Sequence, residues 1–272
     1  MMFEDIANNK LEFPTLPEVA LRVRKLIENP NVTTIQVARA LSTDASLTAR
    51  LLQIANSAMF AGLPQLDTVK AAVNRIGLAL VRNMITCVVM KALYQPKMSP
   101  AITKRMQILW RHSAKVAAFS HGLAKPFPQL RSDEAMLAGL VHDIGTLPIL
   151  TRVEKFPEIA NDPERLQTVI DQLHGNIGRL ILEAWRFPDE LVTVADGHEE
   201  IRRASSGEVD YVDIITVANL HTYLGSDHRL AKLDWSVLPV FEKLNLTPEE
   251  SINVLRDAKT EIAAVYGILS KA

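Results

Sequence analysis

The segment that decides the fold reads Gly139-Leu140-Val141-His142-Asp143-Ile144-Gly145, an apolar helical run that carries a histidine–aspartate pair near its end. We expect Ser132 to cap this helix and Gly145 to close it in the left-handed conformation. Adjacent side chains in mid-helix diverge by about 100°, so one metal ion seldom binds both. At a helix end this constraint relaxes, so the pair can converge on one ion, or its carboxylate can bridge two.

Three further histidines lie on or beside predicted helices, namely His112, His174 and His198. Imidazole and carboxylate together bind borderline divalent metals such as iron, manganese or zinc. A single helical histidine, taken alone, is more often a packed or surface residue than a ligand. That second interpretation stays open for the whole set, and we expect it to hold for His121, His221 and His228.

Helical periodicity dominates the remaining sequence, and no stretch alternates apolar and polar residues for long enough to predict a strand. The sequence therefore predicts an all-α fold. Two prolines in residues 94–100 interrupt any helix there, which makes this segment the best domain boundary. We expect two helical units, residues 1–95 and residues 101–272.

Local motifs give the helix ends within these units. Capping signals at Thr33, Asp44, Asp162-Pro163 and Thr247 predict helix starts. We expect one helix to open at Asp162-Pro163, another to run from about 168 to 185, and Gly77 to separate two helices at 68–76 and 78–94. The buried side of the first unit should include Leu47, Leu51, Leu52, Ile54 and Ile76, and Asn56 should make buried hydrogen bonds near the turn before Phe60.

Bulk composition excludes several classes of protein. The chain has 272 residues and a formal net charge of −1, so it shows no excess of positive charge for duplex DNA or an acidic membrane. Basic residues of the first unit, including Arg22, Arg24 and Arg50, are expected to be a solvated face, which makes a nucleic-acid partner unlikely. Cys87 is a single cysteine in an apolar run and is expected to be buried.

Residues 1–10 are polar and lack the apolar stretch of a signal peptide, and no apolar window is long enough for a membrane span. A cytoplasmic protein is therefore expected.

Several motifs together resemble one protein family. The first half contains Phe13-Pro14-Thr15-Leu16-Pro17, Asp44-Ala45-Ser46-Leu47, Leu51-Leu52-Gln53-Ile54-Ala55-Asn56-Ser57 and Ala72-Val73-Asn74-Arg75-Ile76-Gly77. The second half adds the segment at 139–145, His174-Gly175-Asn176-Ile177-Gly178 and Trp185-Arg186-Phe187-Pro188. From residue 13 to about 223 the chain resembles the HDOD family, relatives of the HD and HD-GYP metal-dependent phosphohydrolases. The resemblance implies a two-lobed, all-helical fold with an HD-like helical core.

The resemblance also implies a ligand set. Carried over residue by residue, the expected metal ligands are His112, His142, Asp143, His174 and His198, holding one or two ions of iron, manganese or zinc. Three positions depart from the HD and HD-GYP patterns. Glu199 stands where a second histidine is usual, Asn219 replaces the closing aspartate, and Thr146 replaces a basic residue. Arg111 and Lys115 are then the nearest candidates in sequence for a phosphate-binding cation.

Two functions follow from this resemblance, and the sequence leaves both open. One is a bacterial signalling or regulatory module that acts on another signalling protein in trans, with a metal site that has lost a ligand. The other is an active metal-dependent phosphohydrolase whose substrate is a phosphomonoester, a nucleotide or a cyclic dinucleotide. The missing carboxylate at Asn219 favours the regulatory module.

Overall fold

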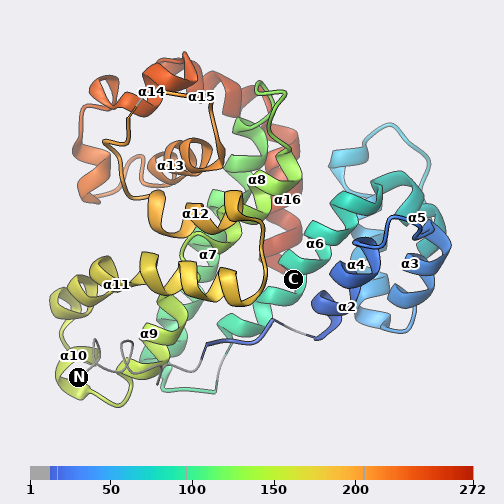
Figure 1. Ribbon diagram of the computed structural model, residues 1–272, viewed down its shortest axis with the longest axis horizontal. Coiled ribbons are helices and arrows are strands. Elements are labelled where there is room, and N and C mark those ends of the chain that lie inside the picture. Colours follow the sequence, from blue (N-terminus) through green and yellow to red (C-terminus); the bar gives the residue numbers. More distant parts are fainter. Residues whose placement is uncertain (1–12, 17, 96, 205, 272) are drawn as a thin grey trace.

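The computed structural model describes residues 13–16, 18–95, 97–204 and 206–271, and the first residues of the chain, on which the signal-peptide expectation rests, lie outside them. Every regular element in these ranges is a helix, and none is a strand. The all-α, two-lobed fold is therefore confirmed. Figure 1 shows a small group of helices, α2 to α5, beside a larger group that contains α7 to α16, with α6 between them.

The first lobe contains short helices connected by tight turns. Its elements are α2 (Glu18–Ile27), α3 (Thr34–Leu41), α4 (Ala45–Ala55), the 3-10 turn Ala58–Phe60, α5 (Val69–Ile76), α6 (Leu78–Met90) and a second 3-10 turn, Lys91–Tyr94. The predicted caps are present, because Thr33 and Gln36 form a capping box and the Asp44 carboxylate accepts hydrogen bonds from the backbone at the start of α4. Gly77 adopts a φ of 82°, which is why the chain breaks there between α5 and α6.

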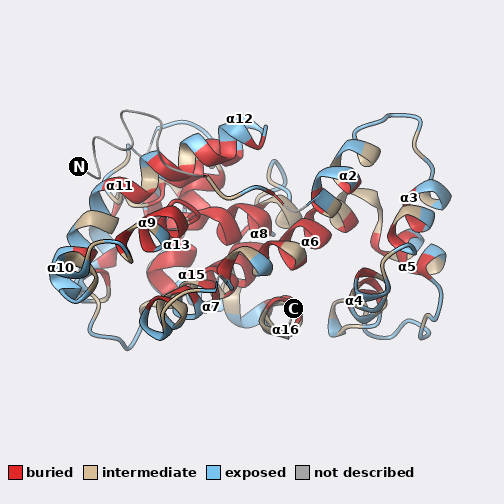
Figure 2. Cartoon of the chain, turned by 90° about the horizontal axis from the view of Figure 1, so that it is seen from below, coloured by how far each residue is buried: buried red, intermediate tan, exposed pale blue. Residues whose placement is uncertain are grey.

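The second lobe is arranged around α7 (Pro100–Leu123), which packs against α8 (Ser132–Val141), α13 (Tyr211–Thr222) and α16 (Lys259–Lys271). Its other α-helices are α9 (Thr146–Val153), α10 (Pro157–Ala160), α11 (Pro163–Ala184), α12 (Asp189–Gly197), α14 (Pro239–Leu244) and α15 (Pro248–Asp257). Helices α8 and α13 are buried along nearly their whole length (Figure 2), which gives the lobe a dense centre.

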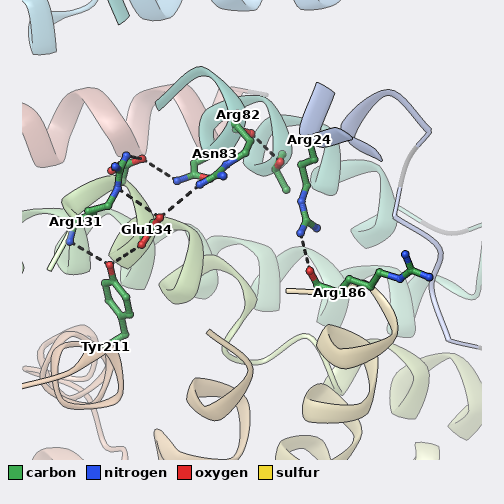
Figure 3. Close-up of polar contacts among 9 residues, drawn as sticks. Arg24, Arg82, Asn83, Arg131, Glu134, Arg186 and Tyr211 are labelled. Carbon is green, nitrogen blue, oxygen red and sulfur yellow. Dashed lines mark hydrogen bonds and ion pairs between the residues drawn. The ribbon is translucent and has the colours of Figure 1, made fainter. Parts of the chain in front are cut away.

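Polar contacts join the two lobes across α6 and α2 (Figure 3). Asn83 on α6 is buried and donates a hydrogen bond of 2.8 Å to Asp133, while Arg82 forms an ion pair of 3.5 Å with Glu134. Arg24 on α2 donates to the carbonyl groups of Trp185 and Arg186, at 3.3 and 3.0 Å. Its guanidinium also lies 4.2 Å from the centre of the Phe187 ring. Arg24 is thus a contact between lobes, and its expected place on a solvated face is wrong.

Some local expectations need correction. Leu47, Leu51, Ile54 and Ile76 are buried as expected, while Leu52 is half-buried. Asn56 is exposed, and its amide pairs with both backbone groups of Leu66 at 2.8 Å, so it fastens the loop after α4 instead of lying in the core. Ser132 is the first residue of α8 and makes no capping hydrogen bond. The helices expected at 162 and at 168–185 are one helix, α11, because Leu166 is fully buried and continues its apolar face.

Within the described ranges no single helix is long and apolar enough to cross a membrane. Only the pair Val69–Ile76 and Leu78–Tyr94 reaches the required length and composition together, and it is bent by 108°.

Candidate metal centre

Four separate elements deliver the five residues that the sequence singled out. His112 lies in the middle of α7 and His174 in α11, while His142 and Asp143 directly follow the end of α8 and His198 directly follows the end of α12. The expectation that the histidine–aspartate pair stands at a helix end is therefore confirmed.

The five side chains meet at the carboxylate of Asp143. Its Oδ2 lies 3.2 Å from Nε2 of His142 and 3.6 Å from Nε2 of His112. Its Oδ1 lies 3.4 Å from Nε2 of His198 and 3.6 Å from Nε2 of His174. The structure thus forms two groups of three possible ligands that share Asp143, and each group uses a different carboxylate oxygen.

Backbone carbonyl groups fix the orientation of three of these imidazoles. Nδ1 of His142 lies 2.8 Å from the carbonyl of Gly139, and Nδ1 of His174 lies 2.7 Å from that of Ile170. Nδ1 of His198 has two such carbonyl partners, at 3.0 and 3.1 Å. A carbonyl oxygen only accepts, so each Nδ1 carries the proton, and in the neutral ring Nε2 presents a lone pair to the centre. Hydrogen bonds of this kind commonly orient metal-binding histidines.

The close approach of α11 explains why residue 145 is a glycine. A Cβ atom on Gly145 would lie 1.9 Å from the carbonyl oxygen of His174 and 2.5 Å from the amide nitrogen of Gly178. Gly145 has a φ of −66°, so its expected left-handed conformation is wrong. It is glycine because the turn after Asp143 packs directly on the backbone of α11, and this contact holds His174 against the carboxylate.

Burial and charge set the protonation of the centre. Burial alone would raise the pKa of Asp143, but positive charge on His142 and His198, together with hydrogen bonds from their rings, outweighs it and holds that pKa well below its ordinary value. Where these rings are neutral, a cation bound between them and the carboxylate would act in the same direction. Burial lowers the pKa of His112 to about 4, although Asp143 acts in the opposite direction. The carboxylate is therefore ionised and His112 is neutral near pH 7.

These features fit a divalent cation. Nε2 of His198 is buried and has no hydrogen-bond partner among the described residues. Ligand atoms bound at about 2.0–2.2 Å to one ion stand about 3 Å apart, close to the spacing observed here. Lone pairs of neutral imidazoles and an anionic carboxylate repel one another unless protons or a cation lie between them. Nitrogen and oxygen donors in this combination suit iron, manganese or zinc.

The centre opens into a pocket of about 620 Å³. His112, Asp143, His174 and Thr146 are among the residues that line it. Its cationic side chains are Arg105 and Arg229. The sequence-based candidates, Arg111 and Lys115, are wrong for this role, because Arg111 lines a different pocket and Lys115 donates a hydrogen bond of 3.2 Å to the carbonyl of Thr222. Sequence reasoning did not indicate Arg105 as a phosphate-binding cation, because it lies two helical turns before His112 on α7. Only the structure shows that both residues line the same pocket.

Glu199 and Asn219, two of the positions that differ from the HD and HD-GYP patterns, have different environments. Glu199 lines the pocket and faces Arg229 at 3.8 Å, outside both groups of possible ligands. Asn219 is buried, and its Oδ1 has no hydrogen-bond partner among the described residues. On α13 it lies one turn after Thr216, which donates to the carbonyl of His198, and one turn before Tyr223, which stacks on His112. Asn219 is therefore on the face of α13 that looks toward the cluster.

The remaining histidines do not share one role. Nδ1 of His121 lies 3.2 Å from the carbonyl of Ser132, and Nε2 of His221 lies 2.8 Å from the hydroxyl of Ser251, so both have structural contacts. His228 lines the pocket and stacks on Tyr223 with ring centres 3.7 Å apart. His228 thus lines the pocket but lies outside both groups of possible metal ligands, and Tyr223 is a pocket residue that sequence patterns did not indicate.

The chain belongs to the HDOD family, because the model of the HDOD domain matches residues 13–201. The resemblance deduced from its motifs is therefore confirmed. The matched range covers the described part of the first lobe and the second lobe as far as residue 201, and all five clustered histidine and aspartate residues lie inside it.

Solved structures share this fold. A candidate metal-dependent phosphohydrolase from Shewanella amazonensis SB2B is 30% identical, with a TM-score of 0.82, and the match covers 99% of this chain and 95% of that chain. An HDOD domain protein with unknown function from Geobacter sulfurreducens is 21% identical, with a TM-score of 0.72 and coverage of 94% and 93%. At this lower identity the second similarity shows the fold alone.

A curated relative, an uncharacterized protein of Treponema pallidum (strain Nichols), is 25% identical over 229 residues. The match covers 79% of this chain and 43% of the relative, so the chain spans less than half the length of that protein.

Proposed function

We propose that this chain is an HDOD regulatory module with a carboxylate-bridged metal centre, and that it acts on another signalling protein. One observation carries the metal centre: four Nε2 atoms surround the ionised Asp143, and three of them belong to rings whose protons are fixed on Nδ1. A bound divalent ion would lower the pKa of a coordinated water and so supply a nucleophile suited to phosphoester cleavage.

Two histidines lie near each carboxylate oxygen of Asp143, and this arrangement supports a centre for up to two ions. His112 and His142 would hold one ion with Oδ2, and His174 and His198 would hold the second with Oδ1. Asn219 faces the cluster with an amide, which offers no negative charge to either ion. This loss weakens metal binding and favours regulation over rapid catalysis.

Metal content of the purified protein tests the centre. We expect the wild type to bind one or two divalent ions, and Asp143→Asn to bind them more than about 100-fold more weakly, since even outer contacts contribute 10–100-fold. His121→Gln, which changes a buried histidine away from the cluster, is the matched control and should bind as the wild type does. A wild type that binds no iron, manganese or zinc, or equal binding by Asp143→Asn, would contradict the proposal.

An active phosphohydrolase is the second candidate, and the pocket supports it. Three of the proposed metal ligands line the pocket, namely His112, Asp143 and His174, and so do Arg105 and Arg229, two cations that suit a phosphate group. Turnover of a panel of phosphomonoesters, nucleotides and cyclic dinucleotides tests this candidate with metal present. The regulatory proposal expects slow or undetectable turnover, whereas fast turnover by the wild type would overturn it. In Asn219→Asp the added carboxylate should tighten metal binding.

A further inference from the structure

His112 differs from the other three histidines in how its ring is held. Their Nδ1 atoms have carbonyl partners, whereas no hydrogen bond of Nδ1 of His112 occurs among the described residues. Its side chain is 18% exposed, compared with 0%, 5% and 1% for His142, His174 and His198. His112 thus stands at the pocket side of the centre without the restraint that orients its neighbours.

The ring of Tyr223 contacts His112, which has no carbonyl partner at Nδ1 among the described residues. The ring of Tyr223 is nearly parallel to the ring of His112, with an interplanar angle of 24° and ring centres 5.4 Å apart. The His228 ring also stacks on Tyr223, with ring centres 3.7 Å apart and an interplanar angle of 10°. Parallel packing of rings restricts how His112 can rotate about its side-chain bonds.

The turn after α13 holds this stack in place. The hydroxyl and the amide of Ser226 both donate to the carbonyl of Tyr223, at 2.6 and 3.0 Å, and the amide of His228 donates to the Ser226 hydroxyl at 3.2 Å. Nδ1 of His228 then accepts from the amide of Leu230 at 3.3 Å. His228 is therefore fixed as a support for Tyr223, and Gly225 with a φ of 76° permits the turn.

We infer that Tyr223, supported by His228, is a positioning residue that holds His112 in the orientation required for metal binding. The inference rests on the metal centre proposed above. It also relates the pocket to the metal, because Tyr223, His228 and His112 all line the pocket wall. A molecule that displaced the stack would release the orientation of one ligand.

A zinc titration in competition with a chromophoric chelator tests this role in the full chain. Tyr223→Leu should weaken the binding of Zn²⁺ to the group that contains His112 by about 10–100-fold, the usual effect of losing a contact that orients a ligand. The group formed by His174 and His198 should keep its affinity. Tyr223→Phe, which preserves the ring, should bind as the wild type does, and His228→Ala should show a smaller loss in the same direction.

The arms of this experiment separate the possible failures. A wild type without Zn²⁺ binding would refute the metal centre and the inference together. Normal binding by both the wild type and Tyr223→Leu would refute only the inference, as would an equal loss in Tyr223→Phe, which would assign the effect to the hydroxyl group. Thermal unfolding of the metal-free proteins identifies any variant that does not fold, and in that case His228→Ala decides, because normal binding by this variant would then overturn the inference.

Discussion

At the residue scale, Nε2 of His221 lies 2.8 Å from the hydroxyl oxygen of Ser251, and that hydroxyl donates its own proton to the carbonyl of Pro248 at 2.6 Å. Ser251 can therefore only accept from His221, which places the imidazole proton on Nε2. Nδ1 is buried and has no hydrogen-bond partner among the described residues. A second proton would have to bind at this enclosed atom, and burial accordingly lowers the pKa of His221 to about 4.

This depressed pKa predicts a loss of stability in mild acid. The unfolded chain binds a proton at His221 below about pH 6.5, whereas the folded chain does so only below about pH 4. The free energy of unfolding should therefore fall as the pH decreases from about 6.5 to about 4, by roughly 3 kcal/mol from this residue. Urea denaturation of the wild type and His221→Gln across this range measures the effect.

The comparison of the two proteins isolates His221 from the other buried histidines, such as His112, because these titrate equally in both. His221→Gln should lose roughly 3 kcal/mol less between pH 7 and pH 4. Parallel pH profiles for the two proteins would show that His221 titrates in the folded chain as it does in the unfolded chain.

Residue types drew attention to the histidine–aspartate pair and the helical histidines, and the resemblance to the HDOD family then gave the five side chains that meet at the candidate centre. Neither was sufficient to predict Tyr223 and His228, because the position of these rings depends on how a turn folds back after α13. Arg229 could not be predicted as a pocket residue for the same reason, because it follows that turn and its position beside the pocket depends on the fold of the turn.

At the scale of elements, the position of α11 depends on the absence of a side chain at Gly145. Gly145→Ala should force α11 away from the turn after Asp143, because a Cβ atom would lie 1.9 Å from the carbonyl oxygen of His174. We expect a loss of about 1–3 kcal/mol or more in the free energy of unfolding, the usual effect of overpacking. Metal affinity should fall as well, because α11 carries His174. Denaturation and metal titration of the same variant measure both.

Gly267 provides a control of opposite sign. It lies within α16, and a Cβ atom there would meet nothing within 4 Å. Gly267→Ala should raise the free energy of unfolding by up to about 1 kcal/mol through helix propensity alone. Unchanged stability and metal binding in Gly145→Ala would show that the turn and α11 can separate freely.

Helix starts could be predicted well, because capping depends on a few adjacent residues. Thr33, Asp44, Asp162 and Thr247 all cap helices through their side chains as their motifs indicate. The conformation of Gly145 could not be predicted, since a glycine needed for a left-handed residue and one needed for close packing look the same in sequence. Only the distance to α11 distinguishes them.

At the scale of the whole molecule, contacts between the lobes involve charged residues that a composition argument assigns to solvent. The carbonyl groups at the end of α11 have no intrahelical partners, and Arg24 from α2 supplies donors for those of Trp185 and Arg186. Arg186 adopts a φ of 55°, which turns the chain toward Phe187 beneath the guanidinium. The first lobe therefore fixes the end of the helix that carries His174.

Removing this guanidinium tests whether the lobes stabilise each other. Arg24→Ala should lower the free energy of unfolding by about 1–3 kcal/mol, because two charge-assisted hydrogen bonds and a cation–π contact are lost. Arg22→Ala is the matched control on the same helix: its contact with Thr43, at 3.3 Å, is exposed and lies within the first lobe, so a change below about 0.5 kcal/mol is expected. A double-mutant cycle with Phe187→Leu should give a coupling of about 0.5–1 kcal/mol between Arg24 and the ring. Equal effects of Arg24→Ala and Arg22→Ala, together with zero coupling, would mean that the lobes are held together by their apolar contacts alone.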